Sequence, residues 1–240
     1  MPDRFIESFA SRMAGTLYIV STPIGNPDDI TLRAVRILKQ VAIVAAEDPR
    51  YTEALFAHHA ITTPLTSYHN VNKEDKTPVL IRRLEEGQSV ALVSDAGTPV
   101  ISDPGAFLVR QALASGIRVV PVPGPSAVLA ALSASGLAGE AFVFLGSLPR
   151  QTGRRSRLLA RMRGDDRPLV LFESPSRLRA TLREILAVLG NRRMALARDL
   201  TKSGEAIIRG TAKELLRGSA SRPGRGEITL VVAGRRRGIR

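Results

Sequence analysis

The most informative stretch of this sequence is VSDAGTPVISDPG, residues 93–105. It follows an apolar run, Val90–Val93, that predicts a strand buried on both faces. With two glycines and two prolines it is more elaborate than a connector needs to be. Asp95 can accept hydrogen bonds from a ligand and place negative charge near a cation, whereas we expect Asp103 to cap a helix beginning at Gly105. Because open α/β sheets bind ligands beyond the carboxyl ends of their strands, this loop is a candidate binding site.

Around this loop, short apolar runs alternate with helical patterns, which is typical of a parallel sheet with crossover helices. Asp29 is placed to cap the first helix. The strands are predicted at Leu17–Ser21, Val41–Ala45, Val90–Val93 and Arg118–Val122. The helices are predicted at Thr31–Lys39, Thr52–His58, Lys73–Glu86, Gly105–Ser115 and Ser126–Ser135.

The segment PVPGP, residues 121–125, cannot continue a helix and is interpreted as a hinge between two domains. Beyond it, only a short helix separates the last two predicted strands, which favours a mixed sheet. The strands are predicted at Phe142–Gly146, Leu169–Phe172, Met194–Ala197, Glu205–Arg209 and Glu227–Val232. The helices are predicted at Arg154–Met162, Ser176–Val188 and Ala212–Arg217.

The fold class is therefore α/β, with two α/β domains, a parallel sheet in the first, a mixed sheet in the second and a cleft between them. We expect a leader over residues 1–14, domains over residues 15–123 and 124–234, and a basic tail over residues 235–240. Residues 218–226 are expected to form a flexible basic loop.

Three further segments at predicted strand ends carry unusual residues. In STPIGNPDD, residues 21–29, two prolines fix the backbone and a glycine admits a close ligand; a tight turn is the plainer interpretation. In AEDPRYT, residues 46–52, two acids and an arginine form either a self-contained ion cluster or a site for a ribose or a proton. In PGPSA, residues 123–127, a helix begins whose amides favour a carboxylate or hydroxyl acceptor, besides serving as cap and hinge.

Charge is distributed unevenly along the chain. The net charge is +13, yet residues 1–120 contain 12 basic and 13 acidic residues, whereas residues 121–240 contain 23 and 9. A GC-rich genome explains an excess of arginine over lysine but not this asymmetry. We therefore predict a phosphate-contacting face on the second half. Its densest part consists of Arg150, Arg154, Arg155, Arg157, Arg161, Arg163 and Arg167.

Composition excludes several other classes. The chain has no cysteine, so it has no disulfide, thiol nucleophile or thiolate metal site. No apolar run is long enough to cross a bilayer, and the acid-containing start is not a secretory signal, so we expect a cytoplasmic protein. The three histidines, His58, His59 and His69, lack a metal-binding spacing, and we expect no metal.

Taken together, these segments resemble the ribosomal RNA small subunit methyltransferase I family of the tetrapyrrole-methylase superfamily. The combination of SDAGTPxISDPG with PxPGPSA is highly specific. The family carries Thr and His where this chain has Pro49 and Tyr51, and bulkier residues where it has Ser203 and Gly204. The resemblance spans about residues 15–234 and rests on LYIVSTPIGNPDDITLRA, AAEDPRYT, ALVSDAGTPVISDPG, RVVPVPGPSAVLAALSASGL, FESPSRL and ARDLTK.

The resemblance implies the tetrapyrrole-methylase fold, with S-adenosylmethionine held between the two domains as the methyl donor. It implies methyl transfer to the 2′-hydroxyl of a cytidine ribose in the decoding region of 16S rRNA, by a homodimer. The donor-binding positions that it implies are Ile24, Asp95, Thr98, Ser126, Ala127, Phe172 and Glu173.

A ribose hydroxyl is a weak nucleophile that must lose its proton, so a proton acceptor is expected beside the aligned donor. Lys202 either loses its own proton to act as a base or remains a cation that holds the phosphate of the ribose. Glu173 is four residues from Arg177, and an internal ion pair is its simpler role. We expect residues 47–50 and 199–202 to face each other across the cleft. The catalytic candidates are Asp48, Asp199, Lys202 and Glu205, with Glu173 as a further acceptor.

RNA contacts are expected from arginines. Aromatic residues make up 4% of the chain and Trp is absent, so recognition by backbone charge and RNA shape is expected rather than base stacking on a sheet. The predicted RNA-binding residues are Arg50, Arg154, Arg155, Arg157 and Arg161, together with Arg222, Arg225 and Arg235–Arg237.

Two other functions stay open. A methylase of the same fold that acts on a tetrapyrrole or another small molecule has no use for a basic half. A non-catalytic, ribosome-associated RNA-binding protein explains that half but not four elaborate strand-end loops. Binding of 16S RNA tests the first alternative, and binding of S-adenosylhomocysteine tests the second.

Overall fold

The computed structural model describes residues 14–218 and 226–235. The chain forms two compact units, residues 1–126 and 127–240, so the division falls three residues beyond the predicted boundary at 123. The predicted leader up to residue 13, residues 219–225 of the predicted basic loop with Arg222 and Arg225, and the tail beyond Arg235 lie outside the described residues.

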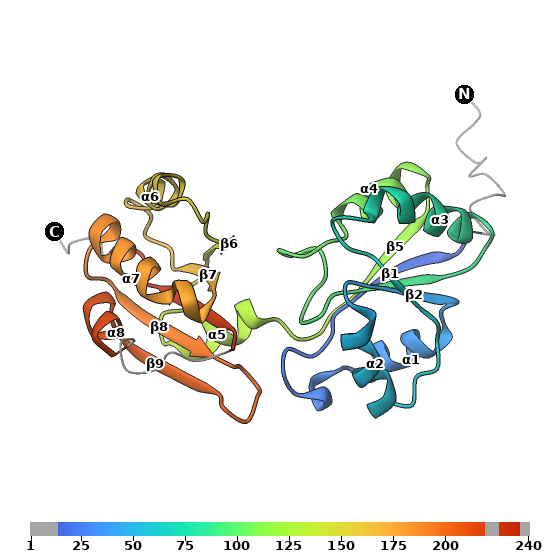
Figure 1. The fold of residues 1–240 in the computed structure, drawn as a ribbon, viewed down its shortest axis with the longest axis horizontal. Coiled ribbons are helices and arrows are strands. Elements are labelled where there is room, and N and C mark those ends of the chain that lie inside the picture. The colour runs from blue at the N-terminus through green and yellow to red at the C-terminus, as the bar shows by residue number, and fades with distance from the viewer. Residues whose placement is uncertain (1–13, 219–225, 236–240) are drawn as a thin grey trace. The chain divides into compact units, whose positions relative to one another are not determined.

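The first unit is a five-stranded parallel sheet, in the order β3-β2-β4-β1-β5, with helices on both faces (Figure 1). Its strands are β1 (Thr16–Val20), β2 (Ile43–Ala46), β3 (Leu65–Ser67), β4 (Val90–Val93) and β5 (Arg118–Val122). Its helices are the short 3-10 helix η2 (Pro27–Asp29), α1 (Leu32–Gln40), α2 (Pro49–His58), α3 (Lys73–Glu85) and α4 (Ala106–Ala114).

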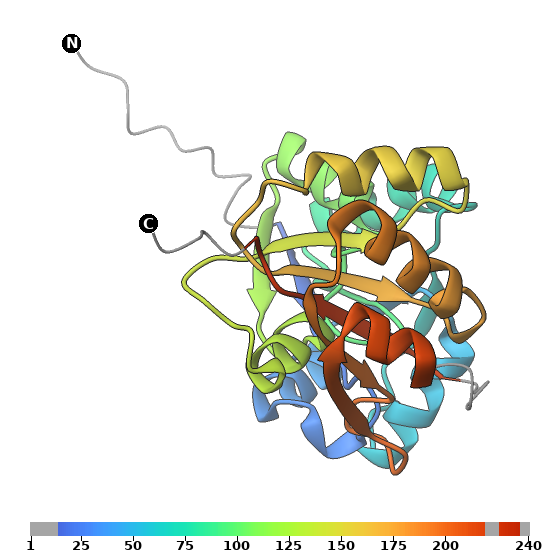
Figure 2. The same cartoon turned by 90° about the vertical axis from the view of Figure 1, so that its left-hand side faces the viewer.

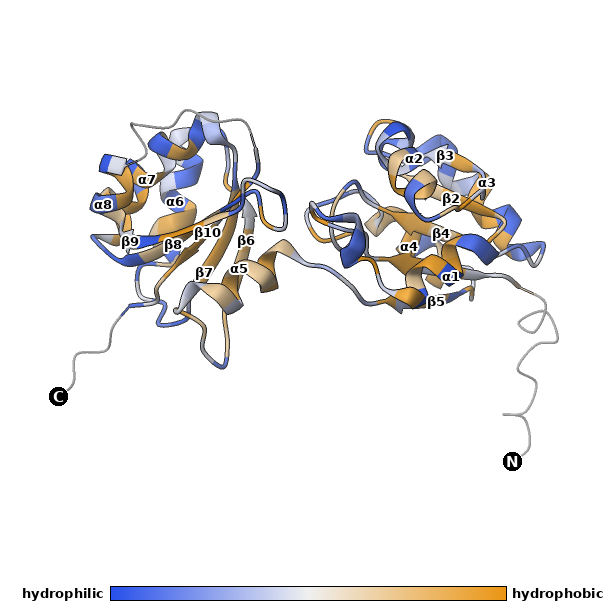
Figure 3. Ribbon diagram, turned by 90° about the horizontal axis from the view of Figure 1, so that it is seen from below, coloured by the Kyte–Doolittle hydropathy of each residue, from blue (hydrophilic) through white to orange (hydrophobic). Residues whose placement is uncertain are grey.

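Strand β4 shows why this sheet forms. Its side chains alternate between two cores, because a strand of a parallel sheet is buried on both faces. Val90 and Leu92 pack into the core under α3 and α4, while Ala91 and Val93 pack into the core under α1 and α2. Figure 3 shows the central strands of this unit coloured as hydrophobic and its helices in a mixture of hydrophobic and hydrophilic colours.

Neighbouring strands β1 and β4 form a switch point in the sheet. The loop after β1 leads to α1 on one face, and the loop after β4 leads to α4 on the other. Loops that leave adjacent strand ends in opposite directions leave room for a ligand between them. The fold therefore directs residues 21–29 and 94–105 to one binding edge.

The second unit is a mixed sheet in the order β6-β7-β10-β8-β9 (Figure 2). Only β6 and β7 are parallel, while the other neighbours are antiparallel. Helices α6, α7 and α8 cover one face, and α5 packs on the other. The strands are β6 (Val143–Ser147), β7 (Leu169–Glu173), β8 (Arg193–Arg198), β9 (Ala206–Thr211) and β10 (Ile228–Val232). The helices are α5 (Ala127–Ser135), α6 (Thr152–Arg161), α7 (Pro175–Leu189) and α8 (Ala212–Gly218).

The predicted pairing of parallel and mixed sheets is confirmed, but the reason given for the mixed sheet is not. The last two strands are not neighbours, since β10 inserts between β7 and β8. The mixture comes from that insertion and from the antiparallel β8–β9 hairpin.

Two of the predicted helix caps, Asp29 and Asp103, are wrong. Thr31, not Asp29, accepts the Ala34 N–H at the start of α1, because residues 27–29 form a turn of their own. Helix α4 begins after Gly105 and has no side-chain cap, so Asp103 is left for another role. Helix α2 begins three residues earlier than predicted, with Asp48 as its cap and proline in its first turn. Across the described residues, no helix is both long and apolar enough to cross a membrane.

Candidate active site

Two strand-end loops of the first unit are joined directly. Thr22, after β1, and Gly97, after β4, form a two-way main-chain bridge with N–O distances of 2.9 and 3.1 Å. The Thr22 hydroxyl also donates to the Ser94 carbonyl at 3.0 Å. Buried and fixed in this way, Thr22 holds the two loops in register at the switch point.

The hinge segment joins the same loops. The hydroxyls of Ser21 and Thr98 are 3.0 Å apart, and Thr98 donates to the Pro125 carbonyl at 3.3 Å. Gly124 lies so close to Ser21 that a Cβ at this position would be 2.9 Å from the Cβ of Ser21. Of the predicted donor residues, Thr98 therefore supports the loop framework, and Ile24 is buried beside Gly97.

The loop after β4 is held in an unusual backbone shape. Val100 and Ser102 have backbone φ values of 77° and 68°, which residues other than glycine seldom adopt. Gly105 has φ of 128°, and a Cβ there would be 2.5 Å from a Leu92 methyl group. Backbone strain of this kind is typical of binding and catalytic loops, where the surrounding fold maintains it.

Three carboxylates gather at the ends of β2 and β4. Asp95 Oδ1 accepts the Asp48 N–H at 2.9 Å, which ties the two strand ends together. Burial, followed by the charges of Asp103 and Asp95, raises the pKa of Glu47. Burial also raises the pKa of Asp103, and the charge of Asp95 adds to this while Ser94 opposes it. The raised pKa values of Glu47 and Asp103 show that neighbouring carboxyl groups repel one another at this edge, which a cationic ligand would relieve.

This acidic edge is expected to destabilise the empty protein. Because the pKa of Asp103 is higher in the folded chain, its destabilising effect is complete above that pKa and fades as the pH falls toward the unfolded value. Asp103→Asn should raise the free energy of unfolding by about 0.5–1 kcal/mol at neutral pH, and the gain should vanish in acid. Urea unfolding across pH measures this, with exposed Glu53→Gln as control. A loss of stability at neutral pH would contradict it.

A cavity of about 420 Å³ opens beside this edge, within the size range of small-molecule sites. Its lining includes Thr22, Pro23, Asp95, Arg50, Tyr51 and His58. Tyr51, one of the two positions at which the motif resemblance implied a departure, therefore lines this cavity, and the other, Pro49, precedes the lining residue Arg50.

Asp48 and Arg50 form a local pair. The Arg50 guanidinium donates to both carboxylate oxygens, at 3.1 and 2.8 Å, and lowers the pKa of Asp48. Asp48 also caps α2. Both roles make Asp48 a weak proton acceptor, while the Arg50 side chain stays exposed at the cavity rim.

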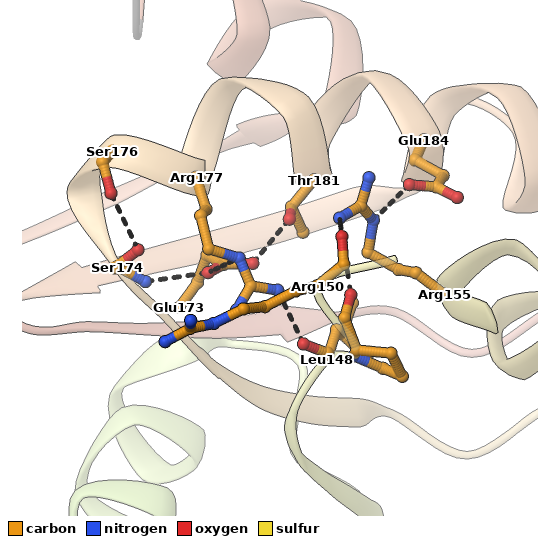
Figure 4. A network of polar contacts seen from close by, with 10 residues as sticks. Leu148, Arg150, Arg155, Glu173, Ser174, Ser176, Arg177, Thr181 and Glu184 are labelled. Carbon is orange, nitrogen blue, oxygen red and sulfur yellow. Dashed lines mark hydrogen bonds and ion pairs between the residues drawn. The ribbon is translucent and has the colours of Figure 1, made fainter. Parts of the chain in front are cut away.

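In the second unit, Glu173 is turned inward at the end of β7 (Figure 4). Its buried carboxylate accepts the Thr181 hydroxyl at 2.5 Å and the Ser174 N–H at 2.9 Å, and pairs with Arg177 at 3.3 Å. The simpler interpretation of the Glu173–Arg177 spacing is therefore confirmed. Phe172 packs edge-on against Phe144, with ring centroids 5.1 Å apart.

One predicted RNA contact is wrong. Arg155 is 6% exposed, and its guanidinium pairs with buried Glu184 (Figure 4). The Glu184 carboxylate also accepts the Ser156 hydroxyl. Arg155 and Leu159 share the inner face of α6 because they are one turn apart. The other three predicted arginines of α6 are exposed: Arg154, Arg157 and Arg161.

The catalytic candidates of the second unit share one loop after β8. Asp199 and Thr201 have φ of 49° and 65°. Asp199 Oδ1 accepts the Glu227 N–H at 3.1 Å, Lys202 Nζ pairs with Glu227 at 3.3 Å, and Glu205 accepts the Thr201 N–H at 2.6 Å. Asp199 Oδ2 has no hydrogen-bond partner in the described part of the chain.

Gly226 was missed by sequence reasoning and supports this loop. Its φ is 126°, and a Cβ here would overlap the Asp199 carboxylate. Within the described ranges, the buried Arg198 Nε and Thr201 Oγ1 lack hydrogen-bond partners, which is uncommon for buried polar groups. No cluster of His, Asp and Glu suited to a metal occurs among residues 14–218 and 226–235.

The strand order, the switch point and the strained loops together characterise one class of α/β protein. The family of Tetrapyrrole (Corrin/Porphyrin) Methylases matches residues 16–216. Uroporphyrin-III C-methyltransferase from Thermus thermophilus, solved with S-adenosyl homocysteine, is 24% identical, with a TM-score of 0.63 over 90% of this chain and 97% of that one. The chain thus has the tetrapyrrole-methylase fold.

Relatives with higher sequence identity identify the family within this fold class. Proteins named ribosomal RNA small subunit methyltransferase I are 51% identical in Pseudomonas aeruginosa and 48% identical in Halalkalibacterium halodurans. These matches cover 92% of this chain, and 79% and 76% of those proteins. The chain belongs to the ribosomal RNA small subunit methyltransferase I family.

Proposed function

We propose that the protein transfers a methyl group from S-adenosylmethionine to the 2′-hydroxyl of a cytidine ribose in the decoding region of 16S rRNA. The names of the relatives support an rRNA substrate. The ribose position and the cytidine follow from the motif resemblance. The bound donor supplies a methyl group already activated by its sulfonium.

The observation that carries the proposal is the negative edge of the first unit. S-adenosylmethionine bears a sulfonium and an ammonium, and Glu47, Asp95 and Asp103 lie together at strand ends where the fold leaves space for a ligand. We propose that Asp95 accepts hydrogen bonds from the donor. The other proposed contacts are made largely by the main chain near Ile24, Thr98 and Ser126.

Asp95→Asn tests this site. Asparagine keeps an oxygen for the Asp48 N–H but loses the charge, so the affinity for S-adenosylhomocysteine should fall about 10- to 100-fold. Calorimetry measures the affinity, and exposed Asp75→Asn on α3 should bind like the wild type. If Asp95→Asn binds S-adenosylhomocysteine as tightly as the wild type, the donor site lies elsewhere. If the wild type does not bind S-adenosylhomocysteine at all, the proposed enzymatic function is wrong.

The charge of the second unit supports RNA as the acceptor. Arg154, Arg157 and Arg161 lie at i, i+3 and i+7 of α6, on one exposed face. A face of this kind neutralises the regularly spaced phosphates of a nucleic acid. Binding to small ribosomal subunits and to a precorrin, compared side by side, separates these acceptors; preference for the precorrin would overturn the RNA assignment.

We propose that Asp199 accepts the hydroxyl proton and that Lys202, which pairs with Glu227, holds a phosphate of the substrate. Asp199 has an unpartnered oxygen within the described residues and a strained backbone, whereas Asp48 is committed to Arg50. We also propose a homodimer, as the resemblance implies, and a cytoplasmic location, as the composition favours; a monomer in sedimentation would contradict the first of these.

A further inference from the structure

A second cavity lies in the second unit, at the opposite end of its sheet from the Asp199 loop. It measures about 740 Å³. Strand β10 relates the two ends: Ile228 pairs with Arg198 at one, and Val232 pairs with Met194 at the other. Four residues of antiparallel strand separate them by about 14 Å. The residues that matter to its chemistry are Arg163, Arg192, Arg193 and Arg235, with Leu189 and Ala233.

Arg192 builds this cavity. Its guanidinium donates to the carbonyls of Arg163, Ala233 and Leu189, at 2.7, 3.1 and 3.3 Å. It thereby ties together the segment after α6, the end of β10 and the last turn of α7. Gly234 completes the wall, because a Cβ there would overlap the Asp166 carbonyl. Hydrogen bonds and close packing therefore fix the shape of this cavity.

The charge of the cavity is positive. Its lining in the described residues contains four arginines and no acid, and the side chains of Arg163, Arg193 and Arg235 are exposed. Two acids, Asp165 and Asp166, follow the lining residues Arg163 and Gly164 in the chain. Asp165 forms a two-point pair with Arg167, at 3.0 and 2.7 Å, which lowers its pKa to about 2. The Asp165 charge also acts on Arg192, so the positive charge of the lining rests on the exposed Arg163, Arg193 and Arg235.

We propose that this cavity binds the phosphodiester backbone of the RNA substrate, at a nucleotide other than the one that is methylated. The inference rests on the proposed function. Guanidinium groups match phosphate oxygens in a two-point geometry, and three of them project from separate segments around one opening. This arrangement suits a chain of phosphates better than one small anion. The contact would help to select a long RNA over an isolated nucleoside.

The double variant Arg163→Ala/Arg193→Ala tests the proposal and spares Arg192. The dissociation constant for 16S rRNA should rise about 10-fold, and the slope of log K against log salt should flatten by about 1.4 for two lost phosphate contacts. KM for RNA should rise while kcat at saturating RNA is unchanged. The matched control, Arg179→Ala/Arg183→Ala, removes the same charge from the exposed side of α7 and should change binding less than twofold.

Several outcomes would overturn the proposal. An Arg163→Ala/Arg193→Ala variant that binds 16S rRNA as tightly as the wild type would do so. An equal loss of RNA affinity in this variant and in Arg179→Ala/Arg183→Ala would also do so, because it indicates a general charge effect. Pyrophosphate binding, measured by calorimetry, serves as a probe for small anions. If the Arg163→Ala/Arg193→Ala variant loses pyrophosphate binding but keeps its RNA affinity, the cavity is a small-anion site. Thermal melting and S-adenosylhomocysteine binding report folding; if the double variant melts early, Arg193→Ala alone must give half the slope change. Failure of the wild type to methylate RNA would instead refute the proposed function.

Discussion

Asp199→Asn is expected to lower kcat about 100-fold while leaving KM for RNA and the affinity for S-adenosylhomocysteine within twofold. Asparagine has the same shape, tolerates the backbone φ of 49°, and can still accept the Glu227 N–H. Only the basic oxygen is lost. A fall confined to kcat therefore identifies a proton acceptor rather than a residue that shapes the loop.

The matched change is Glu205→Gln in the same loop. Glu205 is exposed, and its carboxylate binds the Thr201 N–H, which an amide oxygen also accepts. This variant should keep at least one third of kcat. Single-turnover methylation measures both variants. If Glu205→Gln loses activity and Asp199→Asn does not, the assignment of the acceptor is wrong.

Arg155→Ala is expected to lower the free energy of unfolding by about 3–5 kcal/mol. The change leaves Glu184, with a side chain 8% exposed, as a buried charge whose remaining partner is the Ser156 hydroxyl. It also removes bonds to the carbonyls of Pro149 and Arg150 at 3.5 and 3.4 Å. Urea unfolding measures the loss, and Arg155→Leu/Glu184→Leu should recover most of it because no unpaired charge remains.

The same variant tests the correction to the RNA surface. At a temperature where Arg155→Ala is folded, its affinity for 16S rRNA should be within twofold of the wild type, whereas Arg157→Ala, on the exposed face of α6, should weaken binding. Weakened RNA binding with a stability loss below about 1 kcal/mol would return Arg155 to the RNA-contacting residues.

Two parallel strands of the first unit were predicted with the bounds that the structure has. Strand β4 is a fully buried apolar run bounded by polar residues, and β5 keeps three valines within Arg118–Val122 although it lies at the sheet edge. Strand β3 was missed, because Leu65–Ser67 has three residues with one apolar side chain at a sheet edge, where pairing with β2 decides. Strands with several apolar residues can therefore be predicted from the sequence pattern, whereas a short strand with one apolar residue is determined by its pairing with a neighbouring strand.

For the candidate site, the sequence indicated the loops but not their mutual bonds. Parallel topology predicts that strand-end loops share an edge, and they do. It does not predict that Asp95 binds the Asp48 N–H, or that Glu47 and Asp103 share its field. Those contacts depend on the strained path of residues 94–105, which a propensity cannot specify.

Arg155 shows a signal that sequence could have supplied. In an arginine-rich run every guanidinium looks equivalent, yet the phase of Leu158, Leu159 and Met162 already directs one side of α6 inward. Arg155 belongs to that side, and Glu184 lies 29 positions further along the chain. The helical phase, rather than the density of charge, separates the structural arginine from the exposed ones.

The most direct test of the central claim is the chemical identity of the methylated product. Small ribosomal subunits from cells lacking this gene would be incubated with the protein and labelled S-adenosylmethionine, and the RNA digested to nucleosides for mass spectrometry. We predict one new labelled nucleoside, 2′-O-methylcytidine, at about one per subunit, and its loss in Asp95→Asn at limiting donor. Label on a base, or label only on an added tetrapyrrole, would contradict the account.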